Sequence, residues 1–150
     1  MKIPAAQVYF HGEDAYVSTM SDSRGLLVGE GPIVLIRDYR NHLEKLGNAL
    51  VDAMNRSRAG VLRSEVSNSL SEQHARLANS NSWEKFATSS VCVGVRTVEK
   101  QREATLWLPI RSGKYMEPVE GAVSYFSKDE SPETIGKILI DLADHNGEAE

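Results

Sequence analysis

The chain has 150 residues, of which 41% are hydrophobic and 25% are charged, and its formal net charge is −4. This length and balance predict one globular domain, residues 1–150, that buries its own core. No run of about 18 apolar residues could span a bilayer, and residues 1–6 lack the hydrophobic centre of a secretory signal, so we expect a soluble, cytoplasmic protein with no membrane partner.

Cysteine and histidine usage excludes further kinds of site. Cys92 is the only cysteine, so no disulfide can form within the chain. The four histidines lack the short spacings of a metal site, and no glycine-rich loop precedes a predicted helix as a phosphate cradle requires. We therefore expect neither a metal ion nor a cofactor.

The first quarter of the chain predicts two to four antiparallel strands. Residues 7–11 and 15–19 are rich in aromatic and β-branched side chains, and Gly12-Glu13-Asp14 between them is typical of a hairpin turn. Residues 26–28 and 33–36 are apolar and are separated by a glycine-rich turn that ends in proline.

A first long helix is predicted over residues 38–56, with Asp38 as its N-cap. Its predicted inner face consists of Leu43, Leu46, Leu50, Val51 and Met54. From residue 57 to residue 82 the apolar positions are sparse, so a long mobile connection and a marginal helix fit equally well. Ser82 then caps a short helical turn that places Trp83 and Phe86 on one side.

The second half repeats strands followed by a helix. Residues 91–95 and 104–108 alternate between apolar and other side chains and predict a half-buried hairpin. A short strand at residues 115–116 and a strand over 121–126 follow. The helix over 131–145 is the best marked, because Ser131 can accept hydrogen bonds from its first turn.

That last helix has Pro132 at its first position, Glu133 at the positive end of its dipole, and Asn146-Gly147 as its expected stop. Its apolar stripe consists of Ile135, Ile138, Leu139 and Leu142.

The two predicted helices share one pattern, which either reflects a repeated design or arises by chance. Residues 44–52 and 133–141 both read Glu-x-aliphatic-Gly-x-x-Leu-aliphatic-Asp. A helical glycine costs about 1 kcal/mol relative to alanine, so Gly47 and Gly136 indicate close approach to a neighbouring backbone, which we expect to be a sheet. The predicted class is α+β, with antiparallel β-sheets packed against two long helices and the strands-then-helix order occurring twice.

Several of these features together resemble the immunity proteins of bacterial contact-dependent growth inhibition (CDI) systems. They are the Trp83-x-x-Phe86 turn, the alternating strand over 91–95, the hairpin that ends at Leu108-Pro109, and the Ser-Pro-Glu-x-Ile-Gly start of the helix at 131. The resemblance implies a small cytosolic antidote, not an enzyme, that binds the toxin domain of a neighbouring cell, often a nuclease, and blocks its active site. Some members are similar in fold to the Whirly single-stranded-DNA-binding proteins, whose basic Lys-Gly-Asn-Lys motif is absent here.

The charge distribution suits such a partner. Residues 117–150 contain nine acidic residues against two lysines, which favours a basic protein partner and argues against nucleic acid at that end. Carboxylates can imitate the phosphates that a cationic nuclease site holds. The predicted toxin-binding residues are Glu13, Asp14, Glu117, Glu120, Asp129 and Glu130, with Tyr115 and Tyr125 as aromatic anchors, and the loop acids Asp22 and Glu30 as further candidates.

Two other function classes remain open, as do the oligomeric state and the chemistry of the toxin. A nucleic-acid-binding module of Whirly-like fold would use Arg56, Arg58 and Arg63, although no aromatic residue lies between positions 39 and 83 to stack on bases. A small hydrolase or ribonuclease would use His11 and His74 as an acid/base pair, although their spacing matches no known mechanism.

Overall fold

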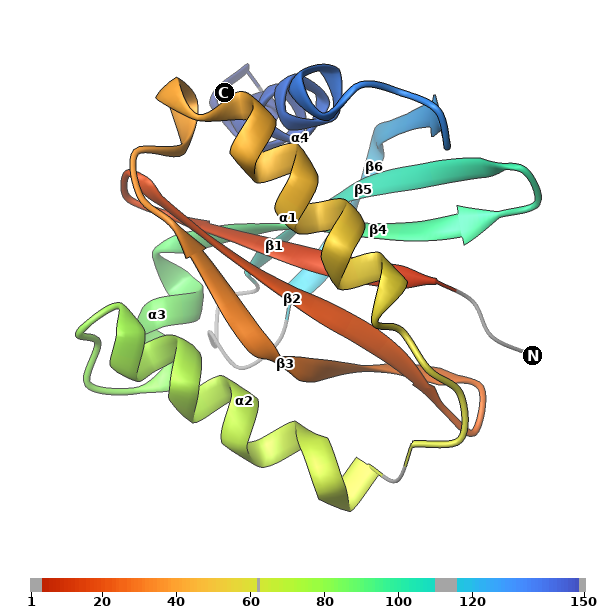
Figure 1. The fold of residues 1–150 in the computed structure, drawn as a ribbon. Helices are drawn as coiled ribbons and strands as arrows, with labels where there is room; N and C mark the ends of the chain where they lie inside the picture. The colour runs from red at the N-terminus through yellow and green to blue at the C-terminus, as the bar shows by residue number, and fades with distance from the viewer. Residues whose placement is uncertain (1–3, 62, 110–115, 149–150) are drawn as a thin grey trace.

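A computed structural model describes residues 4–61, 63–109 and 116–148 (Figure 1). The six strands are β1 (Ala5–His11), β2 (Asp14–Ser23), β3 (Leu26–Ile36), β4 (Ser90–Val98), β5 (Gln101–Pro109) and β6 (Met116–Ser127). The α-helices are α1 (Leu43–Asn55), α2 (Arg63–Leu77), α3 (Trp83–Thr88) and α4 (Pro132–Glu148), and a 3₁₀ turn, η1 (Tyr39–Asn41), precedes α1. None of the helices within these ranges is both long and apolar enough to cross a bilayer.

The strands form one antiparallel sheet in the order β3-β2-β1-β4-β5-β6. The two halves of the chain meet at its centre, where β1 pairs with both β2 and β4, so that Val8 lies opposite Val17 and Val93. Because side chains alternate along a strand, Val8 and Phe10 face one side of the sheet and Tyr9 faces the other. Both sides of β1 are largely buried, which explains why all but Gln7 and His11 of its residues are apolar.

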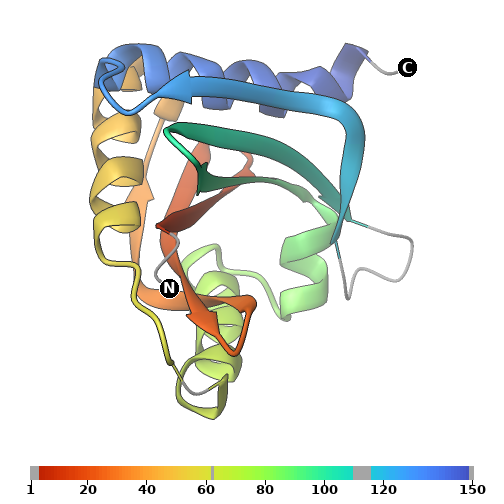
Figure 2. The same cartoon turned by 90° about the vertical axis from the view of Figure 1, so that its right-hand side faces the viewer.

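The helices α1 and α4 cover one side of the sheet (Figures 1 and 2). Leu46 and Leu50 of α1 and Leu139 of α4 are fully buried against the strands. Burying one such side chain stabilises the fold by about 1.5–3 kcal/mol. The two predicted apolar helix faces therefore pack against the apolar side of the strands to form this core.

Two glycines allow α1 and α4 to cross at close range. A Cβ atom at Gly47 would overlap the carbonyl group of Pro132, and one at Gly136 would overlap the carbonyl group of Leu43. The prediction that both glycines approach a neighbouring backbone is confirmed. The prediction that this backbone belongs to a sheet is wrong, because each glycine faces the other helix.

The other side of the sheet has a smaller core beneath α2 and α3. Tyr9, Tyr16, Phe86 and Cys92 are buried there, and Trp83 packs against them. Ser82 caps α3 as predicted, accepting a hydrogen bond of 3.2 Å from the backbone N–H of Lys85. Of the two alternatives for residues 57–82, the helical one is correct for α2.

The α+β class is confirmed, but the predicted arrangement of two long helices with strands-then-helix occurring twice is wrong. There is one sheet, and three of the four α-helices follow the first three strands while only α4 follows the last three. The interval between α1 and β4 is occupied by α2, which was one of two alternatives for that stretch, and by α3, the predicted short turn.

Three boundaries also differ from the prediction. β3 continues across Gly31-Pro32, where its pairing with β2 has an irregularity between Val17 and Thr19. An edge strand tolerates the proline because one side of its backbone needs no partner. Asp38 adopts a left-handed conformation and precedes η1, so His42 and not Asp38 is the N-cap of α1. The helix α4 begins as predicted, with the Thr134 N–H donating to Ser131 Oγ at 3.2 Å, but it continues to Glu148, past the expected stop at residues 146–147.

Candidate interaction surface

The predicted toxin-binding residues lie in two separate regions. Glu13 and Asp14 lie at the turn from β1 to β2. Glu117, Glu120 and Tyr125 lie on β6, and Asp129 and Glu130 follow in the turn to α4. Because β1, β4 and β5 separate β2 from β6, the structure does not bring the two sets together. Tyr115 lies outside the described residues.

The first region borders an open groove of about 480 Å³ between the β1–β2 turn, the end of β3 and the end of α2. Asp14 Oδ2 lies 3.5 Å from Arg37 Nη1, and both side chains are accessible to solvent. His11, at the base of the groove, is tied to the core, because its Nδ1 lies 2.9 Å from Ser90 Oγ and its ring stacks on Phe86 at 4.8 Å. This end is polar and mildly acidic.

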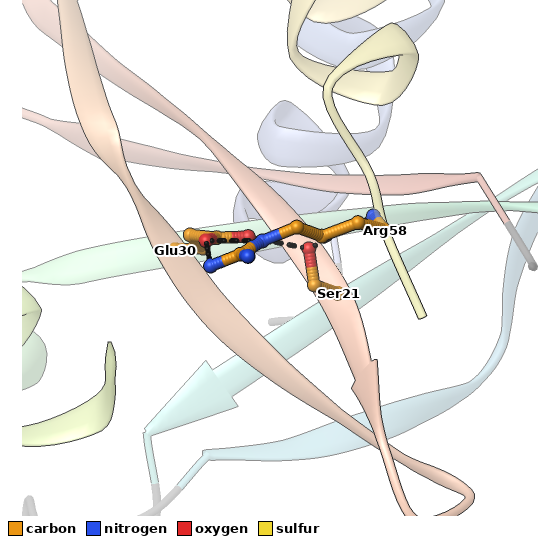
Figure 3. A network of polar contacts seen from close by, with 3 residues as sticks. All are labelled: Ser21, Glu30 and Arg58. Atoms are coloured by element: carbon orange, nitrogen blue, oxygen red, sulfur yellow. Dashed lines mark hydrogen bonds and ion pairs between the residues drawn. The ribbon is translucent and has the colours of Figure 1, made fainter. Parts of the chain in front are cut away.

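Two of the further acidic candidates have structural roles. Glu30 accepts hydrogen bonds from the guanidinium of Arg58 and, at 2.7 Å, from Ser21 Oγ (Figure 3). The hydrogen bonds from Arg58 hold the pKa of Glu30 below its ordinary value. Asp22 Oδ1 accepts from the backbone N–H of Gly25 at 3.0 Å within the β2–β3 turn. Glu30 is therefore committed to an internal contact and is poorly placed to meet a partner.

The second region contains an ordered row of polar side chains across three strands. Arg96 of β4, Glu103 of β5 and Tyr125 of β6 are opposite one another in register. Glu103 accepts from Arg96 Nε at 3.0 Å and from Tyr125 Oη at 3.2 Å. The row thus holds the ring of Tyr125, the one described aromatic candidate, in place, although its side chain is exposed.

Neighbouring positions on the same side of the sheet are apolar. Val98 and Val123 lie two residues from Arg96 and Tyr125 along their strands and so share their side. The ring of Trp107 lies over Gly94, where a Cβ atom would come within 3.2 Å of Nε1. We call these side chains the open face; it consists of Arg96, Val98, Glu103, Trp107, Val123 and Tyr125.

The acidic residues of β6 do not all point toward the open face. Glu117 lies opposite Leu108, which packs into the core beneath α1 and α4, so Glu117 is on that side of the sheet. Glu120 is exposed next to Gly121, whose positive φ of 83° marks an irregularity in β6. The predicted stretch of acidic residues is therefore an exposed margin and not one continuous patch.

The histidines do not support the alternative of a hydrolase or ribonuclease. His74 is buried in α2, and burial lowers its pKa to about 4, so it is neutral near pH 7 and out of reach of substrate. Cys92 is also buried, and burial raises the pKa of its thiol to about 12. Across the described ranges, no group of His, Cys, Asp and Glu side chains is arranged to hold a metal ion.

Of the basic stretch, Arg58 is paired, whereas Arg56 is exposed. Arg58 is bound to Glu30, and the only arginine of the open face, Arg96, is bound to Glu103. A nucleic-acid site needs cations that are free to replace counterions along a phosphate chain. The open face has aromatic residues but no unbalanced positive charge.

Sequence reasoning identified Tyr125 but missed its partners. Nothing in the sequence distinguishes Arg96 and Glu103 from other charged residues. Arg96 lies 7 positions from Glu103, and Glu103 lies 22 positions from Tyr125. Only the alternation of residues 104–108, extended back by one residue, indicated that Glu103 faces away from the core. The pairing of β5 with β6 is what defines the row.

Two solved structures share the fold of this chain. The Neisseria meningitidis protein of unknown function NMB0488 superposes with a TM-score of 0.78 at 15% sequence identity, over 97% of this chain and 95% of that chain. A chain of the CdiA-CT/CdiI toxin and immunity complex from Yersinia pseudotuberculosis gives a TM-score of 0.75 at 15% identity, over 95% of this chain and 96% of that one. No protein-family model and no curated protein matches the sequence. The similarity establishes a common fold along nearly the whole chain.

Proposed function

We propose that this protein is an immunity protein that binds and neutralises a CDI toxin domain. The observation that supports the proposal most is the fold shared with a chain of the toxin and immunity complex from Y. pseudotuberculosis. The Trp83–Phe86 turn and the helix that starts after Ser131, two features on which the sequence resemblance rests, both form.

In the proposed mechanism the protein covers the active site of the toxin, and it catalyses no reaction itself. A nuclease, the toxin class that the resemblance favours, must hold phosphate in a cationic site. The exposed carboxylates of Glu117, Glu120 and Asp129 and the half-buried carboxylate of Glu130 would attract such a site and accelerate the encounter. Binding would take place in the cytoplasm, where the toxin would reach its substrate.

Protection of growing cells tests this function. The toxin domain encoded directly upstream of the gene for this protein is produced in bacteria with and without the chain. We expect growth to stop without the chain and to continue with it. An unrelated toxin domain serves as the specificity control and should remain inhibitory. Growth arrest by the cognate domain despite equal amounts of folded chain would overturn the proposal.

A further inference from the structure

An exposed apolar area lies at the centre of the open face. Tyr125 is 58% exposed, Val123 37% and Val98 36%, and the half-buried Trp107 lies in the same area. These side chains come from three neighbouring strands on one side of the sheet. In the described part of the chain, α2 and α3 pack on this side against β3 and β4 (Figure 2), and leave these positions accessible.

The geometry of this area is fixed before any partner binds. The rows Arg96, Glu103, Tyr125 and Gly94, Thr105, Val123 are held by continuous strand pairing. Both charges in the area are satisfied internally, because Glu103 bonds Arg96 and Tyr125. A partner that covers Tyr125 would therefore lose little side-chain entropy.

The margin of the area is charged, whereas its centre is apolar. The turns that flank it contain Glu99 and Lys100 between β4 and β5, and Lys128, Asp129 and Glu130 after β6. The acidic residues outnumber the lysines there. Both turns lie at the same end of the strands, because Gln101 pairs with Ser127. An apolar, aromatic centre next to a polar margin is the usual anatomy of a protein–protein interface, in which Tyr is a frequent anchor.

We infer that the open face is the centre of the toxin-binding interface, and that the toxin covers it with an apolar surface bordered by arginine and lysine side chains. This inference rests on the proposed function and specifies its surface. Because Arg96 and Glu103 neutralise each other, the centre supplies affinity through burial, and the acidic margin supplies the attraction and orientation.

The test measures the affinity of purified variants for the purified toxin domain by titration calorimetry. Tyr125→Ala should weaken binding by about 30-fold, as expected when an anchor worth roughly 2 kcal/mol is truncated. Val123→Asp should weaken it at least as much, because it would bury an unpaired charge. Tyr125→Phe keeps the ring and loses only the bond to Glu103, so it should retain most of the affinity.

Matched controls separate this surface from general effects. Leu26→Ala, at the start of β3, removes a hydrophobic side chain that is 62% exposed outside the open face, and should leave affinity unchanged. Circular dichroism and thermal unfolding confirm that each variant is folded. Wild-type affinity in folded Tyr125→Ala and Val123→Asp proteins would overturn the inference while the proposed function stands. Failure of the wild-type chain to bind or protect would overturn the function and the inference together.

Discussion

His74 shows what burial does to a single ionisable residue. Its Nδ1 lies 2.9 Å from the carbonyl oxygen of Leu70, which can only accept, so Nδ1 carries the proton and Nε2 is the basic atom. Nε2 is buried without a hydrogen-bond partner among the described residues, and the ring packs against Tyr9 and Trp83 at 4.9 and 5.7 Å. Among the described residues, no charged side chain contributes to the pKa of this ring.

We expect His74 to make the fold sensitive to acid. Its pKa falls from 6.5 to about 4 on folding, so between these pH values His74 is protonated in the unfolded chain and neutral in the folded chain. The free energy of unfolding is therefore unaffected by this difference above pH 6.5. It decreases by about 3 kcal/mol as the pH falls towards 4. Urea unfolding at pH 7 and pH 4.5 measures the loss.

Replacement of the ring isolates this effect from that of the carboxylates. In His74→Phe the loss between pH 7 and 4.5 should be smaller than in wild type, by about 2 kcal/mol. Equal pH dependence in His74→Phe and wild type would show that His74 is not the group responsible.

The pKa of Glu30 is lowered as well, but by a charged hydrogen-bond partner and not by burial. The bonds from Arg58 lower its pKa, so its contribution to stability is present above the ordinary pKa of a glutamate and is lost as the pH falls through the lowered value. Arg58 is more than half exposed, which weakens the pair through solvent. Glu30→Gln should therefore cost about 1 kcal/mol in the free energy of unfolding at pH 7.

Glu13→Gln is the matched control for Glu30→Gln, because Glu13 is an exposed glutamate in a turn, and it should change the free energy of unfolding by less than about 0.5 kcal/mol. Equal effects of the two substitutions would show that the Glu30–Arg58 contact adds nothing to stability.

At the scale of elements, the crossing of α1 and α4 makes an unusual prediction about glycine. Alanine normally stabilises a helix by about 1 kcal/mol relative to glycine. At Gly47 and Gly136 a methyl group would overlap the backbone of the other helix, so the sign should reverse. We expect Gly47→Ala and Gly136→Ala each to destabilise the protein by about 2–4 kcal/mol in urea unfolding. Asn48→Ala, exposed on the same helix, should be neutral or stabilising, and a stabilising Gly47→Ala would contradict the observed crossing.

Elements with strong local signals could be predicted from the sequence. The capping residues Ser82 and Ser131 fixed the starts of α3 and α4, because a cap is a contact between residues two or three apart. The helix α2 could not be predicted firmly, since few of its positions are apolar and it is held by packing of Leu70 and His74 against the sheet. The unbroken course of β3 was hidden by Gly31-Pro32, a pair that usually marks a turn.

At the scale of the whole molecule, the open face depends on contacts that local sequence cannot encode. The pairing of β1 with β4 joins residues about 85 positions apart, such as Val8 with Val93. That pairing joins the two halves of the sheet, whereas the row of Tyr125 with Arg96 and Glu103 is set by the pairing of β4 with β5 and of β5 with β6. Tyr125 could be named as an aromatic anchor from the sequence, but without the register of β6 its row could not be constructed. The single-domain assignment and the toxin-binding roles of the acidic residues stay predictions.

Charge at the margin should affect the rate of association more than the final affinity. Asp129→Lys combined with Glu130→Lys should slow binding to the toxin domain several-fold at low salt, and the difference should shrink as the ionic strength rises to about 0.5 M. Stopped-flow measurements at both salt concentrations provide the comparison. Glu44→Lys, on α1, is the control and should leave the rate nearly unchanged.

Titration of the toxin's own activity tests the central claim most directly. The purified toxin domain acts on its substrate while increasing amounts of this chain are added. If the protein neutralises the toxin by occupying it, activity should fall linearly and vanish at about one folded chain per toxin molecule. Undiminished toxin activity in the presence of excess folded chain would contradict the account.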